Sequence, residues 1–189
     1  GEPLDNYDNL LRFIRMLSDE KGLHISQRNI TVSTCGIVPR MYDLAQEDLQ
    51  ITLAISLHAS NQQKREQLMP IARKYSLDEL MKACRNYFEK TGRRLTFEYS
   101  LVGGENDSQE DAEELAHLIK GLNCHVNLIP VNPIKERSYV QSDKKVIANF
   151  QNKLEKYQIN VTIRREMGRD IDGACGQLRK SYIDKKEDS

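Results

Sequence analysis

The chain of 189 residues is 39% hydrophobic and 30% charged, which is ordinary for a globular protein and enough for the core of one domain, or two at most. Lysine plus arginine and aspartate plus glutamate number 28 each, so the net charge of zero excludes a global field that draws the protein to RNA or to a membrane surface. The sequence opens with no signal peptide and contains no apolar run of the roughly 18 residues that span a membrane.

Helical and strand-like segments alternate along the chain. The spacing of apolar residues predicts, in order, a helix through residues 10–17, a strand at 29–34, a helix at 39–46, a strand at 49–57, a helix at 77–90, a strand at 95–102, a helix from 108 to about 119, a strand at 125–131, a helix at 142–158 and a strand at 160–164. Residues 49–57 are almost continuously apolar, as in a strand buried on both faces of a parallel sheet. The alternation predicts an α/β fold of βαβ units around a mostly parallel sheet.

Polar residues follow several of these strands. In parallel α/β folds, ligands bind at the carboxyl ends of the strands, where the loops converge. We therefore expect Glu2, Ser33, Ser56, His58 and Asn132 to surround one pocket. Each also has a structural interpretation: serines cap strand ends, an asparagine before proline shapes a turn, and a single histidine is more often structural than catalytic.

Several common functional patterns are absent from the sequence. It contains neither the glycine-rich dinucleotide motif nor the phosphate-binding P-loop, and neither a nucleophile elbow nor a zinc-protease helix. The carboxylates Glu110, Asp111, Glu113 and Glu114 fall at the start of a predicted helix, where they favour the helix dipole. We interpret them as solvent-facing.

The stretch Asp170-Ile171-Asp172-Gly173-Ala174-Cys175-Gly176-Gln177-Leu178 contains the most unusual cysteine. Small neighbours leave the sulfur of Cys175 accessible to a large partner, and the two glycines favour a loop. A buried structural cysteine in a glycine-rich turn is the alternative interpretation. The stretch alone does not decide between them.

The four cysteines, Cys35, Cys84, Cys124 and Cys175, lie far apart and form no C-x-x-C pair. That spacing argues against a zinc ribbon and against a small disulfide scaffold, so a reducing cytoplasm is the expected location.

Several motifs together resemble the RlmN/Cfr family of radical SAM RNA methyltransferases. They are GEPLDNYDN, NITVSTCGIVP, ISLHAS, LVGGENDS, IPVNP and REMGRDIDGACGQLR, and the last is closer to RlmN than to Cfr. The resemblance implies a partial (β/α)6 radical SAM barrel, here lacking its first strands. It implies one domain over residues 1–189, in which residues 165–189 form an extension that carries the Cys175 loop.

The resemblance also implies roles for individual residues. Cys175 matches the cysteine that is methylated and then carries the one-carbon unit, so it is the implied catalytic residue. The implied binding residues for S-adenosylmethionine are Gly1 and Glu2 at its amino end, Ser33, the segment Ser56-Leu57-His58, and Asn132 near its ribose and adenine.

One part of the family pattern is missing. The C-x-x-x-C-x-x-C motif that holds the [4Fe–4S] cluster lies upstream of GEP in the family, and this sequence begins at GEP. We expect no metal ligands in this chain, a cluster only in the full-length enzyme, and an inactive C-terminal fragment when the chain stands alone.

The resemblance implies methylation of C2 of an adenine in large-subunit ribosomal RNA and in tRNA. RNA contacts are expected from Arg164, Arg165, Arg169, Arg179 and Lys180, for which a solvated basic face is the alternative. Three alternative functions remain: methylation of C8 as in Cfr, a non-catalytic RNA-binding or assembly module, and a β/α binding fold unrelated to S-adenosylmethionine. No membrane association is expected, and the sequence indicates no oligomeric state.

Overall fold

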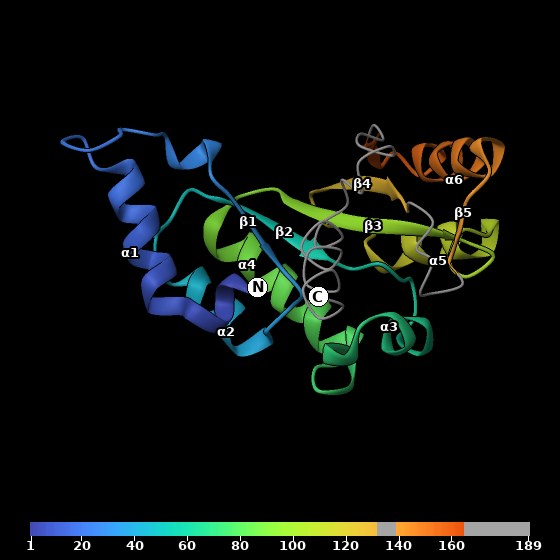
Figure 1. Ribbon diagram of the computed structural model, residues 1–189, viewed down its shortest axis with the longest axis horizontal. Helices are drawn as coiled ribbons and strands as arrows, with labels where there is room; N and C mark the ends of the chain where they lie inside the picture. The colour runs from blue at the N-terminus through green and yellow to red at the C-terminus, as the bar shows by residue number, and fades with distance from the viewer. Residues whose placement is uncertain (132–138, 165–189) are drawn as a thin grey trace, which may run out of the picture.

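Five parallel strands form the centre of the structure, a computed structural model that describes residues 1–131 and 139–164 (Figure 1). The strand order among these residues is β1-β2-β3-β4-β6, so each strand pairs with the one before it in this series. A short strand, β5, pairs antiparallel with the end of β3. The strands are β1 (Thr31–Thr34), β2 (Thr52–Ser56), β3 (Leu95–Gly103), β4 (Cys124–Pro130), β5 (Val140–Gln141) and β6 (Asn160–Ile163).

Helices connect the strands and pack in pairs, α2 against α4 and α5 against α6. In Figure 1, α2 and α4 lie below the β1–β2 part of the sheet. The helices are α1 (Tyr7–Ser18), α2 (Val38–Ala45), α3 (Gln62–Leu68), α4 (Leu77–Thr91), α5 (Gln109–Leu118) and α6 (Lys144–Lys156), with 3-10 turns η1 (Pro3–Asn6), η2 (Gln27–Asn29) and η3 (Pro70–Arg73).

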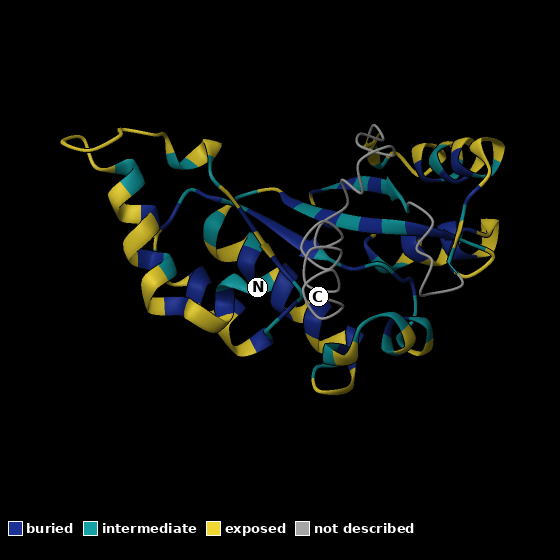
Figure 2. Cartoon of the chain, viewed as in Figure 1, coloured by how far each residue is buried: buried dark blue, intermediate teal, exposed yellow. Residues whose placement is uncertain are grey.

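The two faces of the sheet differ in polarity. Along β3, Phe97 and Tyr99 are fully buried, whereas Thr96, Glu98 and Ser100 between them are only half-buried. Because successive side chains of a strand point to opposite faces, one face of the sheet lies in the helix-covered core and the other is polar. Figure 2 shows this core as the dark blue of β2 and β3. Tyr99 extends the core to α6, where its ring lies 5.2 Å from that of Phe150.

The predicted fold class is confirmed. The strands and helices appear in the predicted order, and the sheet is mostly parallel and open, as in a partial barrel. Five elements were not predicted: the 3-10 turns η1, η2 and η3, the helix α3 and the two-residue strand β5. The strand predicted at 49–57 is shorter, since only Thr52–Ser56 pairs in the sheet.

The prediction that the carboxylates of α5 face solvent was wrong for Asp111. Its side chain is 3% exposed and forms an ion pair of 2.6 Å with Lys64 Nζ of α3. Asp111 also accepts the backbone N–H of Ser108, while the Ser108 hydroxyl accepts the backbone N–H of Asp111, so the two residues cap the start of α5. The carboxylate therefore fixes α3 against α5 in addition to favouring the helix dipole.

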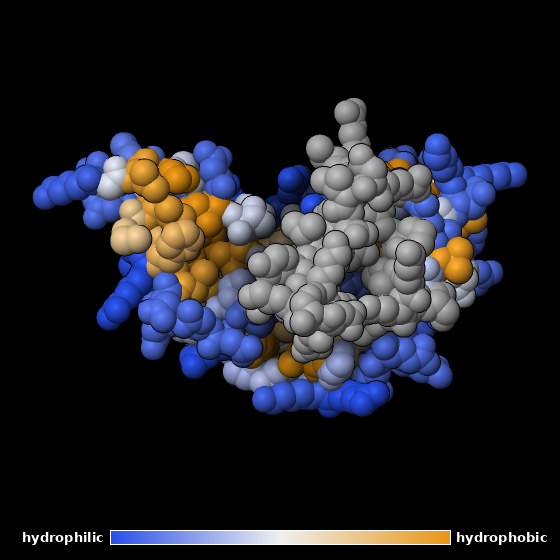
Figure 3. Space-filling view, in the orientation of Figure 1, coloured by the Kyte–Doolittle hydropathy of each residue, from blue (hydrophilic) through white to orange (hydrophobic). Residues whose placement is uncertain are grey.

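Apolar surface is exposed on α1 and on the loop that follows it. Phe13, Met16 and Leu23 are 53%, 65% and 71% exposed. Figure 3 shows apolar surface as orange on the side of the molecule that carries α1. These side chains lie on the helix and the loop that precede β1 in the chain. No helix in the described part of the chain is long and apolar enough to cross a membrane.

Candidate functional site

Glu2 reaches across from the start of the chain to the end of β1. Its carboxylate accepts hydrogen bonds from the Thr34 hydroxyl at 2.7 Å, from the backbone N–H of Cys35 at 2.8 Å and from the backbone N–H of Leu4 at 3.0 Å. Burial raises the pKa of Glu2, but the hydrogen bonds from Cys35, Thr34 and Leu4 together outweigh burial and hold the pKa below its usual value. Glu2 is therefore a fixed, negatively charged group at neutral pH.

Ser33 and Ser56 meet at a third side chain, Glu98. The hydroxyls of Ser33 on β1 and Ser56 on β2 donate to Oε2 of Glu98 on β3, at 3.1 and 3.4 Å. The backbone carbonyl of Glu98 accepts the N–H groups of Leu57 and His58, at 3.0 and 3.3 Å. The end of β2 is thus attached to Glu98 through both side chain and main chain.

His58 has a strained backbone and a defined tautomer. Its φ of 60° lies in the left-handed region, which non-glycine residues seldom adopt. The backbone N–H of Ser100 donates to Nδ1 of His58 at 3.0 Å, so the ring proton is on Nε2. Burial, with a smaller contribution from the charge of Arg65, lowers the pKa of His58 to about 4. At neutral pH the ring is uncharged and offers one N–H donor.

The strained turn at His58 is held by Asn106, which is fully buried. The Asn106 amide nitrogen donates to the carbonyl oxygens of His58 and Ser100, both at 2.7 Å, and its amide oxygen accepts the N–H of Val102 at 2.8 Å. The loop after β3 therefore fixes the backbone at His58 and Ser100. Asn106 was predicted only as part of a loop.

Arg65 joins the segments that follow β1 and β2 through hydrogen bonds to their backbone. This residue of α3 is 1% exposed, and its guanidinium donates to the carbonyl oxygens of Cys35 at 2.8 Å, Leu57 at 3.2 Å and Ser56 at 3.3 Å. Within the described residues all three acceptors are backbone oxygens. Burial lowers the pKa of Arg65, but a guanidinium group remains protonated at neutral pH. Arg65 thereby fixes the position of the backbone from which Ser56 and Leu57 project.

The three cysteines in the described part of the chain are poor nucleophiles. Burial, then the hydrogen bond and the charge of Glu2, raise the pKa of Cys35 to about 12. Burial raises the pKa of Cys84 to about 12 and that of Cys124 to about 11. Since the thiolate is the reactive form, these groups are almost entirely unreactive at neutral pH.

Alkylation kinetics test the low reactivity of the Cys35 thiol, which is half-buried. In the folded protein at pH 8, we expect Cys35 to react with iodoacetamide at least about a hundredfold more slowly than a free thiol of pKa ~8.5. The Glu2→Gln variant removes the negative charge beside the thiol and should increase the rate severalfold, while buried Cys84 stays unreactive. Peptide mass spectrometry measures the rate of alkylation at each cysteine. If wild-type Cys35 reacts as fast as free cysteine, the prediction is wrong.

The predicted site residues are brought together in part. Glu2, Ser33, Ser56 and His58 all lie at the carboxyl end of β1 or β2 or contact it. Leu57 is fully buried, and its backbone N–H and carbonyl oxygen are bonded to Glu98 and Arg65. Gly1 is exposed next to Glu2. Asn132 and Cys175 lie outside the described residues.

One hollow in the described part of the chain lies away from these residues. It measures about 250 Å³ and is lined by the turn around Gly121, the first residues of β4 and β6, and Tyr157. These residues are at the amino ends of the strands, opposite to Ser56. The hollow therefore does not belong to the candidate site.

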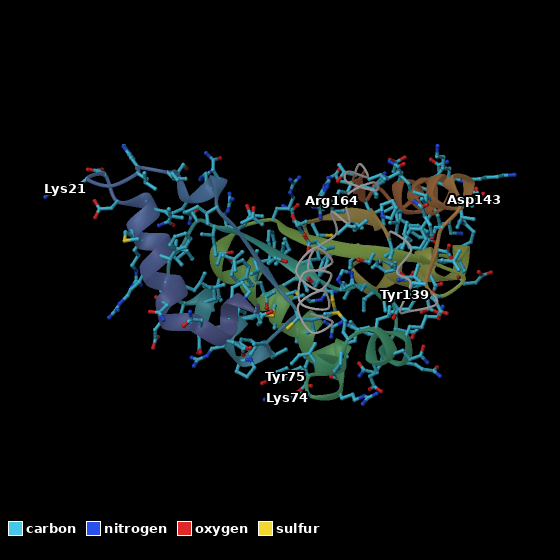
Figure 4. The ribbon with its side chains drawn as sticks, in the orientation of Figure 1. Lys21, Lys74, Tyr75, Tyr139, Asp143 and Arg164 are labelled. Atoms are coloured by element: carbon cyan, nitrogen blue, oxygen red, sulfur yellow. The ribbon has the colours of Figure 1, made fainter. Side chains whose placement is uncertain are left out.

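Of the basic residues expected to contact RNA, only Arg164 falls within the described residues. It follows β6, and its backbone N–H donates to the carbonyl oxygen of Leu128 at 2.8 Å. Figure 4 shows Arg164 beside β4 near the middle of the molecule, whereas Lys21 and Lys74 lie at its periphery. The other four basic residues of the set remain a prediction.

A parallel β/α sheet with its polar groups at the carboxyl strand ends is the arrangement expected of a radical SAM protein, and the sequence profile of the Radical SAM superfamily matches residues 1–119. The chain belongs to the radical SAM superfamily. Within it, the chain is similar over its whole length to proteins named "Probable dual-specificity RNA methyltransferase RlmN". It is 66% identical over all 189 residues to the one from Lachnospira eligens, and 64% identical over 185 residues to the one from Lachnoclostridium phytofermentans. The resemblance to the RlmN/Cfr family is thereby confirmed.

Solved structures agree with this placement. A radical SAM methyltransferase from Sphaerobacter thermophilus superposes with a TM-score of 0.90 at 48% identity, over 95% of this chain and 52% of that one. A domain of pyruvate-formate lyase-activating enzyme from Bacteroides vulgatus shares the fold, with a TM-score of 0.66 at 15% identity over 87% of this chain and 95% of that one. The chain covers 54% and 52% of the lengths of the two RlmN relatives, about half of each.

Proposed function

We propose that the complete protein containing this chain is an RNA methyltransferase that adds a methyl group to C2 of an adenine. Large-subunit ribosomal RNA and tRNA are the proposed substrates, and the cytoplasm is the proposed location. The main support is the similarity to RlmN proteins, which extends over all 189 residues and includes the stretch around Cys175. Cys175 is the proposed methyl carrier. In support of that role, the other three cysteines have raised pKa values.

The polar groups at the strand ends match the polar groups of S-adenosylmethionine. Glu2 carries a negative charge and is held in place by hydrogen bonds from Leu4, Thr34 and Cys35, so it can attract the ammonium group of the cofactor. The hydroxyls of Ser33 and Ser56 and the Nε2–H of His58 add polar groups for the rest of the molecule. When bound, S-adenosylmethionine supplies the methyl group and, with a [4Fe–4S] cluster, radical chemistry.

The residues of this chain would then bind and orient. Glu2 holds the amino end of the cofactor, while Ser56, Leu57 and His58 hold its middle on a backbone fixed by Arg65 and Asn106. Asn132 would contact the ribose and adenine, and the Cys175 sulfur would accept the methyl group. The cluster ligands would come from a part of the complete protein outside this chain. Within the described residues, no three His, Cys, Asp or Glu side chains are grouped to hold a metal.

Nucleoside mass spectrometry tests the proposal. The complete protein, reconstituted with iron and sulfide without oxygen, is incubated with S-adenosylmethionine, a reductant and either unmodified large-subunit ribosomal RNA or tRNA. We expect 2-methyladenosine from both RNAs. Because the cluster ligands are proposed to lie elsewhere, the 189-residue chain alone should yield neither a cluster absorption nor methylated RNA.

The possible outcomes separate the alternatives. Formation of 8-methyladenosine would assign Cfr-like specificity instead. RNA binding without methylation by the reconstituted protein would favour a non-catalytic module. A lack of binding to both RNA and S-adenosylmethionine would refute the proposed function altogether.

A further inference from the structure

Glu98 lies in the candidate site at the point where the hydroxyls of Ser33 and Ser56 converge on its carboxylate. It lies on β3, the middle strand of the order β1-β2-β3-β4-β6, and on the polar face of the sheet. In the parallel register, Glu98 pairs with Ser56 on one side and with Asn127 on the other. A carboxylate in this position faces the same space as Ser33 and Ser56.

The small side chain of Ala54 leaves room for the Glu98 carboxylate to reach β1. Ala54 pairs with Ser33 in the register of β1 and β2, so it is the residue of β2 that separates Ser33 from β3. A larger side chain at this position would stand between Ser33 and Glu98. With alanine there, one carboxylate oxygen receives hydroxyls from two different strands.

The two hydrogen bonds to Glu98 are weak by their geometry. Their O···O distances are 3.1 and 3.4 Å, compared with about 2.7–2.8 Å for a good hydroxyl-to-oxygen hydrogen bond. Hydrogen bonds to a charged acceptor are normally shorter than those to a neutral one. Better-placed hydroxyl donors would therefore displace the serine hydroxyls at little cost.

We propose that Glu98 is a further cofactor-binding residue, whose carboxylate accepts the two neighbouring hydroxyl groups of the ribose of S-adenosylmethionine. The inference rests on the proposed function. A vicinal diol presents two convergent hydroxyl donors, as the two serines do here, and carboxylates bind ribose hydroxyls in other nucleotide sites. The ammonium group of the cofactor is already matched by Glu2, which is fixed and charged at the end of β1.

The position of Glu98 is independent of its side-chain contacts. Its own carbonyl oxygen holds the N–H groups of Leu57 and His58, so the carboxylate is at a fixed separation from the segment proposed to bind the cofactor. Replacing only the carboxylate leaves these backbone bonds in place. The variants Glu98→Gln and Glu98→Ala should therefore fold like the wild type.

Binding of S-adenosylmethionine and of its 2′-deoxy and 3′-deoxy analogues tests the inference. The dissociation constants are measured by calorimetry with the complete reconstituted protein. For the Glu98→Ala variant we expect binding of S-adenosylmethionine to weaken roughly tenfold to a hundredfold, since a hydrogen bond to a charged group is removed. Glu98→Gln keeps one acceptor oxygen and should lose less. The exposed Glu89→Gln on α4 is the matched control and should bind like the wild type.

The analogues distinguish a direct contact from an indirect effect. For a deoxy analogue, the wild type should already bind more weakly, and Glu98→Ala should add a smaller loss than it does for S-adenosylmethionine, because one of the two hydroxyl contacts is already missing. An equal loss for all three ligands would overturn the inference, as would unchanged binding of S-adenosylmethionine by Glu98→Ala. If the wild type itself binds no S-adenosylmethionine, the proposed function fails and this inference fails with it.

Discussion

Replacing Cys175 by alanine in the complete protein is expected to abolish RNA methylation. The proposed reaction transfers the methyl group first to a sulfur atom, and alanine has none. A thiol of ordinary pKa ~8.5 is a few per cent thiolate at neutral pH, and nearby charges change that fraction. Binding of S-adenosylmethionine is assigned to Glu2 and the strand ends, so it should persist in the variant.

The measurement combines RNA methylation with protein mass spectrometry. Active wild-type protein should carry a methyl group on Cys175 and on none of Cys35, Cys84 and Cys124, consistent with the raised pKa values of these three thiols. The Cys124→Ala variant is the control and should retain methylation, because Cys124 is a buried core residue at the start of β4. A fully active Cys175→Ala protein would make Cys175 a structural residue.

The second large effect is expected at Arg65. The Arg65→Met variant keeps most of the side-chain volume but removes every donor to the carbonyl oxygens of Cys35, Ser56 and Leu57. Leaving buried acceptors without a donor costs about 1–3 kcal/mol each, so we expect a total loss of about 3–5 kcal/mol. Because the affected backbone belongs to the cofactor segment, affinity for S-adenosylmethionine should fall as well.

Thermal unfolding checks this prediction. A loss of that size should lower the melting temperature of the complete protein on the order of 10 °C. Arg65→Lys retains the charge but not the planar fork of donors, so its melting temperature should lie between those of the wild type and Arg65→Met. Arg73→Met is the control, since Arg73 is exposed on η3 and should leave the melting temperature unchanged. An unchanged melting temperature for Arg65→Met would show that water or other groups satisfy these carbonyls.

The sequence pattern was sufficient for the elements with clear periodicity. The helix predicted at 77–90 is α4, Leu77–Thr91, because its apolar residues repeat at helical spacing and Ser76 and Glu79 cap its start. The strand predicted at 95–102 is β3, Leu95–Gly103. These segments agree in propensity, capping and burial, and such agreement makes an element predictable.

The helix α3 could not be predicted for a physical reason. Its sequence, QQKREQL, has no apolar stripe, since its fully buried residue is the charged Arg65. Helix prediction from periodicity assumes that the buried face is apolar. The same assumption placed Asp111 in solvent, although its carboxylate is satisfied by Lys64 and Ser108 and is therefore buried.

The candidate site was predictable in its location but not in its connections. The rule that ligands gather at carboxyl strand ends selected Glu2, Ser33, Ser56 and His58. It gave no indication that Thr34, rather than Ser33, donates to Glu2. Glu98 did leave a signal, namely a single carboxylate within an otherwise uncharged strand. Arg65 and Asn106 act through the backbone carbonyls of other residues, and side-chain type alone does not reveal such contacts.

The order of strands in the sheet has a consequence for synthesis on the ribosome. Each parallel strand pairs with the one made before it, so β2 can add to β1, then β3 to β2, and so on to β6. Chains emerge at about 5–20 residues per second, and contacts between neighbouring units need only short loops to close. The sheet can therefore grow during translation, one β/α unit at a time. At each stage, the open edge on the side of growth is the one that the next strand from the ribosome will cover.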